Sequence, residues 1–265
     1  MKYISSPQNS LIKELRQLKQ KKYRDRAGLF VIEGEKLVEE ARKESNGLIK
    51  EIIVSESYNR ENDTEISQWN DKYSISLIPD RLFNEIADTE SPQGIIAMVE
   101  KRATKPEDML HAGSNTILIL DALQDPGNLG TIIRTADAGG VSGIILGPGC
   151  VDLYNPKVLR STMGSVFHVP VCNSDNITMT IDYLKQKGFT IYASHLKGTH
   201  NLFEIDFPSN TAIIIGNEAN GIGQEAEAKA DILLKIPMPG KAESLNASVA
   251  AALMIFEVAR KNFIR

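Results

Sequence analysis

The sequence is poor in the residues and runs that mark several common classes of protein. Its 265 residues include only two cysteines, Cys150 and Cys172, which cannot form a disulfide framework and do not make a Cys-x-x-Cys pair for zinc. No apolar run approaches the ~20 residues that a membrane-spanning helix needs. The first ten residues have no apolar stretch behind Lys2, so they do not form a secretory signal. We therefore expect a cytoplasmic protein with no membrane segment.

Several catalytic and nucleotide-binding motifs are also missing. The chain has no G-x-G-x-x-G after the first expected strand of either domain and no GxxxxGK[ST], which excludes a standard dinucleotide site and a P-loop. It has neither a G-x-S-x-G elbow nor an HExxH zinc motif. Its four histidines lack ligand spacing, and we expect His195 and His200 to be structural or solvated. No metal site is predicted.

Positive charge is scarce overall but concentrated at one end of the chain. The net charge is −4, whereas residues 1–26 carry eight lysines and arginines against Glu14 and Asp25, a local net of +6. A basic segment on an acidic protein predicts a surface for phosphate, although a solvated helix face explains it about as well. The cations that we expect to contact nucleic acid are Lys13, Lys21, Lys22, Arg24 and Arg26.

Hydrophobic periodicity predicts a small α/β sandwich in the N-terminal part. Residues 8–22 form an amphipathic helix with Leu11, Leu15 and Leu18 on one stripe. A second helix carries Leu37 and Val38. A polar stretch follows the strand that ends at residue 54 and runs to about residue 67. Strands are expected at residues 30–32, 49–54, 75–78 and 94–99, with a short helix at 79–87.

The strands change character beyond a linker at residues 101–115. They become short, largely apolar and non-alternating, which is typical of a parallel sheet covered on both faces. These strands lie at residues 116–120, 143–146, 190–193 and 211–215, with helices near 129–139, 155–164, 177–187 and 244–261. The pattern predicts two domains, residues 1–104 and residues 112–265, and the second is α/β.

The first of three unusual segments in the second domain contains N-x-G-x-x-x-R-T-A at residues 128–136. A strand ends, a Pro-Gly turn follows, and Asn128 is placed to cap a helix. Arg134 follows six residues later. Because α/β folds bind ligands at the carboxyl ends of parallel strands, we expect Arg134 to face a site. A capped helix with one surface arginine remains the alternative.

The other two segments also join an apolar strand to a polar loop. The second, I-I-G-N-E-x-x-G-I at residues 214–222, has Gly216 for close backbone approach and Glu218, which is costly to bury unless it is paired. The third, I-P-M-x-G…S-L-N-x-S-V-A at residues 236–250, is a stiff proline loop in which Ser244 or Asn246 caps the next helix. Each segment alone is also explained as an ordinary loop or helix cap.

Taken in this order, the three segments resemble the signature motifs of the SpoU-type (TrmH-like) RNA ribose 2′-O-methyltransferases of the SPOUT superfamily. Together they are highly specific and span about residues 116–262. Residues 24–38 resemble, more weakly, the small RNA-binding domain that precedes the catalytic domain in the rRNA-modifying branch. The resemblance implies a small α/β RNA-binding domain with a basic helical arm. It also implies a C-terminal SPOUT domain with a parallel sheet and a deep trefoil knot.

The resemblance further implies a cofactor, an assembly and a set of site residues. S-adenosylmethionine would bind in the knot, largely through backbone groups, and a homodimer would share the active site. The matching cofactor-binding residues are Gly216, Asn217, Ile236, Met238 and Leu245. The matching catalytic residues are Arg134, Asn128, Glu218, Ser244 and Asn246.

The residue types fit methyl transfer to a sugar hydroxyl. Negative charge develops on the attacking oxygen, and the guanidinium of Arg134, which in proteins is nearly always charged, suits electrostatic stabilisation better than general-base action. A 2′-hydroxyl target means RNA and not DNA. The two-domain layout favours 23S rRNA. The alternatives are a tRNA-directed relative and a non-catalytic RNA-binding assembly factor.

Overall fold

The chain forms two compact units. The computed structural model describes residues 1–44, 47–217 and 219–263. The first unit comprises Met1–Arg102 and Asp152–Phe167, and the second comprises Ala103–Val151 and the chain from His168 onward. By their contacts, residues 152–167 therefore lie with the N-terminal part, although they are far from it in the sequence. The two domains expected from the sequence, residues 1–104 and residues 112–265, placed residues 152–167 in the second domain.

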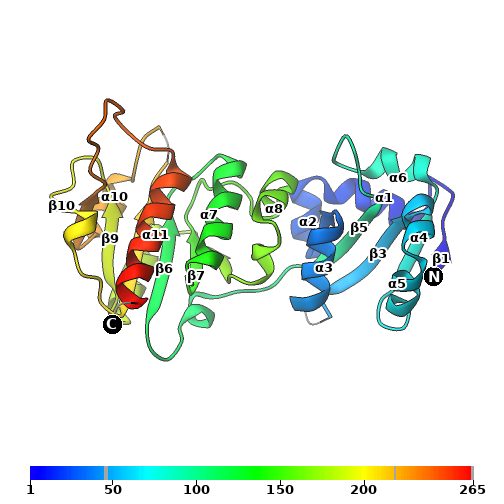
Figure 1. Cartoon of the computed structure of the whole chain (residues 1–265), viewed down its shortest axis with the longest axis horizontal. Coiled ribbons are helices and arrows are strands. Elements are labelled where there is room, and N and C mark those ends of the chain that lie inside the picture. The colour runs from blue at the N-terminus through cyan, green and yellow to red at the C-terminus, as the bar shows by residue number, and fades with distance from the viewer. Residues whose placement is uncertain (45–46, 218, 264–265) are drawn as a thin grey trace. The chain divides into compact units, whose positions relative to one another are not determined.

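The first unit is built on a five-stranded sheet with the order β1-β4-β3-β5-β2 (Figure 1). β1 and β3 run parallel to β4, whereas β5 is antiparallel to both of its neighbours. Its strands are β1 (Lys2–Tyr3), β2 (Leu29–Glu33), β3 (Ile49–Ser55), β4 (Ile75–Ile78) and β5 (Ile95–Glu100). Its helices are α1 (Ser10–Leu18), α2 (Lys21–Ala27), α3 (Glu35–Glu44), α4 (Glu56–Glu61), α5 (Asp63–Trp69), α6 (Asp80–Ile86), α8 (Pro156–Thr162) and the 3-10 helix η2 (Ser165–Phe167).

Helices cover both faces of this sheet. Because side chains alternate along a strand, Ile52 and Val54 of β3 enter one apolar cluster and Ile53 enters the other. The first cluster also contains residues of α3, α4, α5 and α8, and the second contains residues of α1 and α6. The expected α/β sandwich is confirmed.

The helix expected over residues 8–22 is two helices. The side chain of Asn9 caps α1 by accepting a hydrogen bond from the Leu11 N–H, and α1 ends at Leu18. α2 starts at Lys21 and stops at Gly28, whose φ of 66° is left-handed and therefore favours glycine. The polar stretch before residue 67, for which the sequence predicted no element, folds as α4 and α5.

The second unit contains a seven-stranded sheet with the order β10-β12-β9-β11-β6-β7-β8, and all of its pairs are parallel. Its strands are β6 (Asn115–Leu120), β7 (Gly143–Leu146), β8 (Val171–Asn173), β9 (Thr190–Ser194), β10 (His200–Asn201), β11 (Asn210–Ile215) and β12 (Ile232–Lys235). Its helices are η1 (Pro106–Met109), α7 (Pro126–Ala138), α9 (Ile177–Gln186), η3 (Leu202–Glu204), α10 (Gln224–Lys229) and α11 (Ala247–Phe263). The expected parallel sheet is confirmed.

Two layers of helices enclose this sheet. Ile117 and Ile119 of β6 pack in a cluster with residues of α9 and α10, so the intervening Leu118 points to the opposite face. There α7 and α11 pack against each other, and α11 also contacts β11 (Figure 1). A Cβ on Gly139, just after α7, would lie 2.2 Å from the Ile255 Cγ2 atom of α11, so the glycine permits this close approach. The knot stays a prediction.

Within the described residues, no helix is both long and apolar enough to cross a bilayer.

Candidate active site

The first motif forms the turn between β6 and α7. Asp125, and not Asn128 as the sequence suggested, caps α7: its carboxylate accepts a hydrogen bond from the Asn128 N–H at 2.7 Å. Pro126 occupies the first turn, where the missing N–H costs nothing. Asn128 therefore lies inside the first turn of α7 and not at its cap.

The chain just after β6 is held in an uncommon conformation. Ala122 has a φ of 53°, in the left-handed region that residues with a side chain rarely adopt. Its carbonyl accepts a hydrogen bond of 2.8 Å from the Asn217 amide nitrogen. Strained backbone of this kind clusters at functional sites. The contact also brings the second motif to the first.

The second motif is a tight loop after β11. The backbones of Asn217 and Gly221 exchange two hydrogen bonds of 2.9 Å, and the side-chain oxygen of Asn217 accepts from the N–H groups of Ala219 and Asn220. A Cβ on Gly216 would lie 2.3 Å from the carbonyl carbon of Gly221, which only glycine avoids. Gly216 and Asn217 therefore shape the loop itself.

A second contact ties this loop to the end of β6. The Asp121 carboxylate accepts a hydrogen bond of 2.7 Å from the Gly223 N–H. Asp121 and Ala122 thus hold both ends of the loop beside the turn that starts α7. Glu218, expected to be catalytic, lies outside the described residues.

The third motif offers unused backbone groups. Ile236, Met238 and Leu245 are half-buried, and Ser244 is exposed. Within the described part of the chain, residues 237–245 form no hydrogen bond with backbone or side chain. These residues are half-buried or exposed, so their backbone groups are open to water or to a ligand. This segment thus presents N–H and C=O groups that suit the polar edge of a ligand.

Asn246 joins the third motif to the first. Its side-chain oxygen caps α11 by accepting hydrogen bonds from the Ser248 N–H at 2.9 Å and the Val249 N–H at 3.4 Å. Its amide nitrogen donates to the side-chain oxygen of Asn128 at 2.9 Å. Two residues separated by 118 positions in the sequence therefore meet at the amino ends of α7 and α11.

Arg134 lies further along α7. It is exposed and, among the described residues, has no hydrogen-bond or ion-pair partner. Helix geometry places it about 9 Å along the axis and about 120° around it from Asn128. The structure therefore brings Asn128 and Asn246 into contact and leaves the Arg134 guanidinium free, on another side of α7.

The expected RNA-binding cations fall into two groups. Lys13, Lys22 and Arg26 are exposed and form no ion pair in the described part of the chain, so they are available to phosphate. Lys21 is also exposed, but it pairs with Asp25 at 2.6 Å. Lys101 binds the same carboxylate, and the two ammonium groups lower the pKa of Asp25 to about 2.

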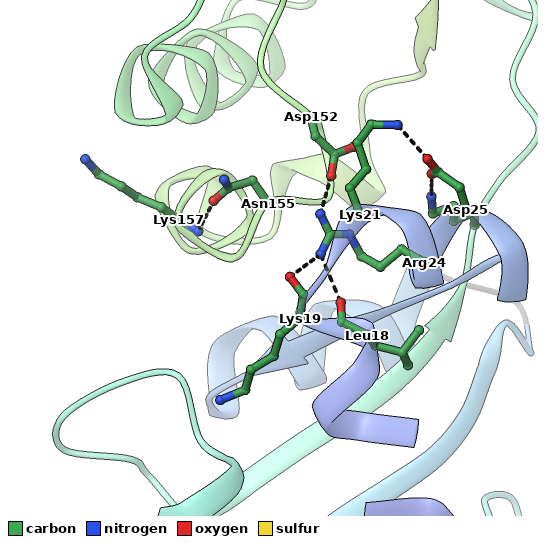
Figure 2. Close-up of polar contacts among 9 residues, drawn as sticks. Leu18, Lys19, Lys21, Arg24, Asp25, Asp152, Asn155 and Lys157 are labelled. Atoms are coloured by element: carbon green, nitrogen blue, oxygen red, sulfur yellow. Dashed lines mark hydrogen bonds and ion pairs between the residues drawn. The ribbon is translucent and has the colours of Figure 1, made fainter. Parts of the chain in front are cut away.

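Arg24 differs from the expectation that it contacts nucleic acid, because it is buried. It is 4% exposed, and its guanidinium donates to the carbonyls of Leu18 and Lys19 and pairs with Asp152 at 2.5 Å (Figure 2). Unpaired buried charge is unfavourable, and Asp152 neutralises this one. Arg24 therefore does not present its charge to a phosphate at the surface.

The Cys150 thiol is not a candidate nucleophile. The Cys150 thiol donates to the Leu120 carbonyl and accepts from the Leu123 N–H, and burial raises its pKa to about 11. At neutral pH it is therefore a thiol and not a nucleophilic thiolate. Among the residues that the structure describes, no cluster of histidine, cysteine, aspartate and glutamate is suited to hold a metal ion.

Two family profiles match the chain. The SpoU rRNA Methylase family matches residues 115–256, which include all three motifs. The MRM3-like substrate binding domain matches residues 9–97, in the first unit. The two matches together cover the parts of the chain where the sequence predicted the catalytic domain and the RNA-binding domain.

Curated relatives and solved structures match the chain over nearly its whole length. The 23S rRNA (guanosine(2553)-2′-O)-methyltransferase RlmP of Bacillus subtilis (strain 168) is 40% identical over 258 residues, which are 97% of this chain and 99% of RlmP. The AdoMet-bound rRNA methyltransferase from Sinorhizobium meliloti is 32% identical with a TM-score of 0.84, covering 98% of this chain and 97% of that one. AviRb from Streptomyces viridochromogenes, in complex with AdoMet, is 26% identical with a TM-score of 0.87, covering 97% and 99%.

Proposed function

The chain belongs to the SpoU rRNA methylase family, and we propose that it transfers a methyl group from S-adenosylmethionine to a ribose 2′-hydroxyl of 23S rRNA. The full-length similarity to RlmP is the observation that carries this proposal. The substrate-binding profile over residues 9–97 supports rRNA as the substrate class. A cytoplasmic location belongs to the same proposal, because such an RNA is met there.

The third motif fits the cofactor. The unpaired backbone groups of residues 237–245 suit the polar edge of an adenine and of an amino-acid group, and half-buried Ile236, Met238 and Leu245 supply apolar contact. Gly216 and Asn217 keep the neighbouring loop tight. When bound, S-adenosylmethionine supplies an electrophilic methyl carbon on a positively charged sulfur.

The proposed catalytic residues act on the RNA side of the reaction. The 2′-oxygen forms a bond to the methyl carbon while the carbon–sulfur bond breaks, and the hydroxyl proton leaves to water. Arg134, free and charged, would stabilise the oxygen or hold the adjoining phosphate. Asn128 and Asn246, joined by their hydrogen bond, would position the ribose. Ser244 and Glu218 complete the proposed set.

We further propose that the protein acts as a homodimer through α11. Val249, Leu253 and Phe256 are 47%, 36% and 51% exposed, and their spacing places them on one side of the helix. An apolar stripe of this kind on a helix suits burial against another protein surface. The stripe starts three residues after Asn246, so a partner seated on it would approach the proposed site.

A methyl-transfer assay tests the proposed reaction. Purified protein and radiolabelled S-adenosylmethionine are incubated with transcripts of 23S rRNA and, separately, with total tRNA. We expect label in 23S rRNA, on a ribose that resists alkaline cleavage because its 2′-hydroxyl is methylated. Label confined to tRNA would establish the tRNA-directed alternative, and no label in either RNA would favour a non-catalytic binding protein.

A further inference from the structure

The helix α8 of the first unit has an outer side that the packing of the unit does not use. Its buried residues, which face inward, are Val158, Leu159 and Thr162. Lys157, Arg160 and Met163 follow one another at a spacing of three residues, so they form one ridge on the side away from those residues. Neighbouring members of the ridge lie about 4.5 Å apart along the helix axis. None of the three belongs to the apolar clusters of the unit or to the proposed catalytic set.

Met163 is held at the surface in an unfavourable conformation. It is the residue that ends α8, its side chain is 48% exposed, and its φ of 52° lies in the left-handed region. Glycine is the residue that fits such a helix end best, because it has no Cβ. Neither burial nor backbone conformation therefore favours a methionine at this position. An exposed apolar side chain on strained backbone points to a contact outside the chain.

The turn that carries Met163 is fixed on its inner side. Thr162 is fully buried, and its hydroxyl donates to the Leu159 carbonyl at 2.7 Å. A Cβ on Gly164 would lie 2.6 Å from the Glu40 Cγ atom, so this glycine packs directly against α3. The Met163 side chain therefore projects from a rigid base, and a partner that contacts it does not have to order the backbone.

Positive charge is in excess around the ridge. The Arg24 guanidinium joins the carbonyls of Leu18 and Lys19 to the Asp152 carboxylate, which ties the basic segment to the chain just before α8 (Figure 2). The cations of residues 19–26 and of α8 are Lys19, Lys21, Lys22, Arg24, Arg26, Lys157 and Arg160, and the carboxylates beside them are Asp25, Glu33, Asp88, Glu90 and Asp152. The cations outnumber the carboxylates, which favours a polyanion as the partner.

Both cations of the ridge are able to bind a phosphate. Lys157 is exposed and has no ion pair in the described part of the chain. Arg160 pairs with Asp88, but both side chains are 37% exposed, and exposed ion pairs are weak. A guanidinium has five N–H donors, so a phosphate can share Arg160 with this carboxylate or replace it.

We propose that the ridge of Lys157, Arg160 and Met163 contacts the RNA substrate, with the two cations on phosphates of one strand and Met163 against an unpaired base. The proposal rests on the proposed function, because it takes RNA as the partner. The sulfur of methionine makes favourable contacts with aromatic rings, and every base offers such a ring. Unpaired bases are the parts of RNA whose faces are open to side chains. Substrate binding would then use a segment that lies within the SpoU match, residues 115–256.

The variant Met163→Gly separates a contact with RNA from a structural role. Glycine adopts the left-handed conformation without strain, so the full-length variant should melt at or above the temperature of the wild type. Its affinity for a 23S rRNA transcript should nevertheless fall about two- to tenfold, the range expected for a sulfur–aromatic contact. Met179→Ala is the control, since Met179 is 68% exposed on α9, and it should bind like the wild type.

Two results with Met163→Gly would overturn the proposal. Wild-type affinity for the transcript would mean that no base contacts the side chain, even if the cations of the ridge bind phosphate. A melting temperature below that of the wild type would mean that Met163 packs within the protein and is not displayed for a partner.

The variant Lys157→Gln tests the contact with phosphate. Each phosphate contact that is lost should lower the slope of log affinity against log salt concentration by about 0.7–0.9. Lys72→Gln is the matched control, because Lys72 is also an exposed lysine of the first unit without an ion pair among the described residues. We expect a lower slope for Lys157→Gln and the wild-type slope for Lys72→Gln. Equal slopes for the two variants would overturn the proposed position of the RNA strand.

Oxidation of methionine provides a measurement on the wild type alone. Hydrogen peroxide converts exposed methionines to the sulfoxide, and tandem mass spectrometry reports the extent at each residue. The transcript should slow the oxidation of Met163 and leave that of Met179 unchanged. Equal oxidation of Met163 with and without RNA would overturn the proposal and would indicate a protein as the partner of the ridge.

The outcomes also separate this proposal from the proposed function. Methyl transfer by the wild type to the transcript, with wild-type binding by Met163→Gly and Lys157→Gln, overturns the contact of the ridge alone. Lack of methyl transfer overturns the proposed function, and the affinity and oxidation measurements then still decide whether the ridge contacts RNA.

Discussion

At the scale of single residues, Arg134 tests the proposed chemistry most directly. Its guanidinium is exposed and free among the described residues, so Arg134→Ala removes no contact that holds the fold. We expect methyl transfer to fall by about 10²–10³-fold, the usual effect of losing a group that stabilises a developing anion. Cofactor affinity, measured by calorimetry, is expected to stay near that of the wild type.

The control for this variant is Arg81→Ala, which removes another exposed arginine, 92% exposed at its side chain, from the first unit. It is expected to leave methyl transfer unchanged. Equal losses of cofactor affinity and of rate in Arg134→Ala would contradict the assignment, because Arg134 would then contribute to cofactor binding and not to the reaction.

The lowered pKa of Asp25 predicts that the free energy of unfolding depends on pH. Hydrogen bonds from Lys101 and Lys21 lower its pKa to about 2 in the folded protein, from the usual 3.8. A lowered pKa stabilises the fold above the unfolded value, and this stabilisation is lost as the pH falls toward the folded value. The stability gap between the wild type and Asp25→Asn should therefore be constant above about pH 5 and narrow between about pH 4 and pH 2.

Urea unfolding at a series of pH values measures this gap. Asp71→Asn is the control, since Asp71 is exposed and has no ion pair in the described part of the chain. It should give no comparable gap at any pH. A gap for Asp25→Asn that persists unchanged to pH 2 would mean that the two lysines do not stabilise the ionised carboxylate.

At the scale of helices and strands, continuous apolar patterns were predicted well and short elements were missed. β6 and β11 are six-residue strands that each contain a run of four apolar residues, and the structure has them at nearly the expected bounds. β8 and β10 have three and two residues, too few to show a period. α4 and α5 bury only Tyr58, Ile66 and Trp69 between them, so their apolar stripe is hidden in a polar sequence.

The polar side of the site was predicted by residue type but not by contact. The hydrogen bond between Asn128 and Asn246 depends on how α7 and α11 pack, which no local pattern encodes. Asp125 was passed over as the cap of α7, although an aspartate directly before a proline is a recognisable start of a helix. In the sequence, Arg24 looks like its basic neighbours. Its buried guanidinium is paired with Asp152, 128 positions away in the chain, and no local pattern reveals that pairing.

Two asparagines that each cap a helix allow the structural role of a cap to be distinguished from a role in the reaction. Asn246 caps α11 and also contacts Asn128, whereas Asn176 caps α9 by accepting from the Met179 N–H. Either residue changed to alanine should lose about 1 kcal/mol of stability, the typical value of an N-cap. Only Asn246→Ala should also slow methyl transfer. Thermal melting and the methyl-transfer assay on both variants check this, and equal activity of the two would leave Asn246 with a structural role alone.

At the scale of the whole molecule, the exposed stripe of α11 predicts how the chains associate. Phe256→Glu places a charge within the proposed interface and should convert dimers to monomers in analytical ultracentrifugation, because burying an unpaired charge is strongly unfavourable. Phe203→Glu is the matched control, as Phe203 is 47% exposed against 51% for Phe256 and lies in η3. A Phe256→Glu variant that still dimerises would place the interface elsewhere.

The assignment of residues 152–167 to the first unit has a practical consequence for chimeras. A chimera that exchanges the N-terminal halves of two relatives at residue 103 would leave a foreign α8 against the new sheet. The pairing of Arg24 with Asp152 and the packing of Phe30 on Tyr154 would then join residues from two different parents. Grafting the substrate-binding part of one family member onto another therefore requires two inserts, and the second, of about sixteen residues, sits within the catalytic sequence.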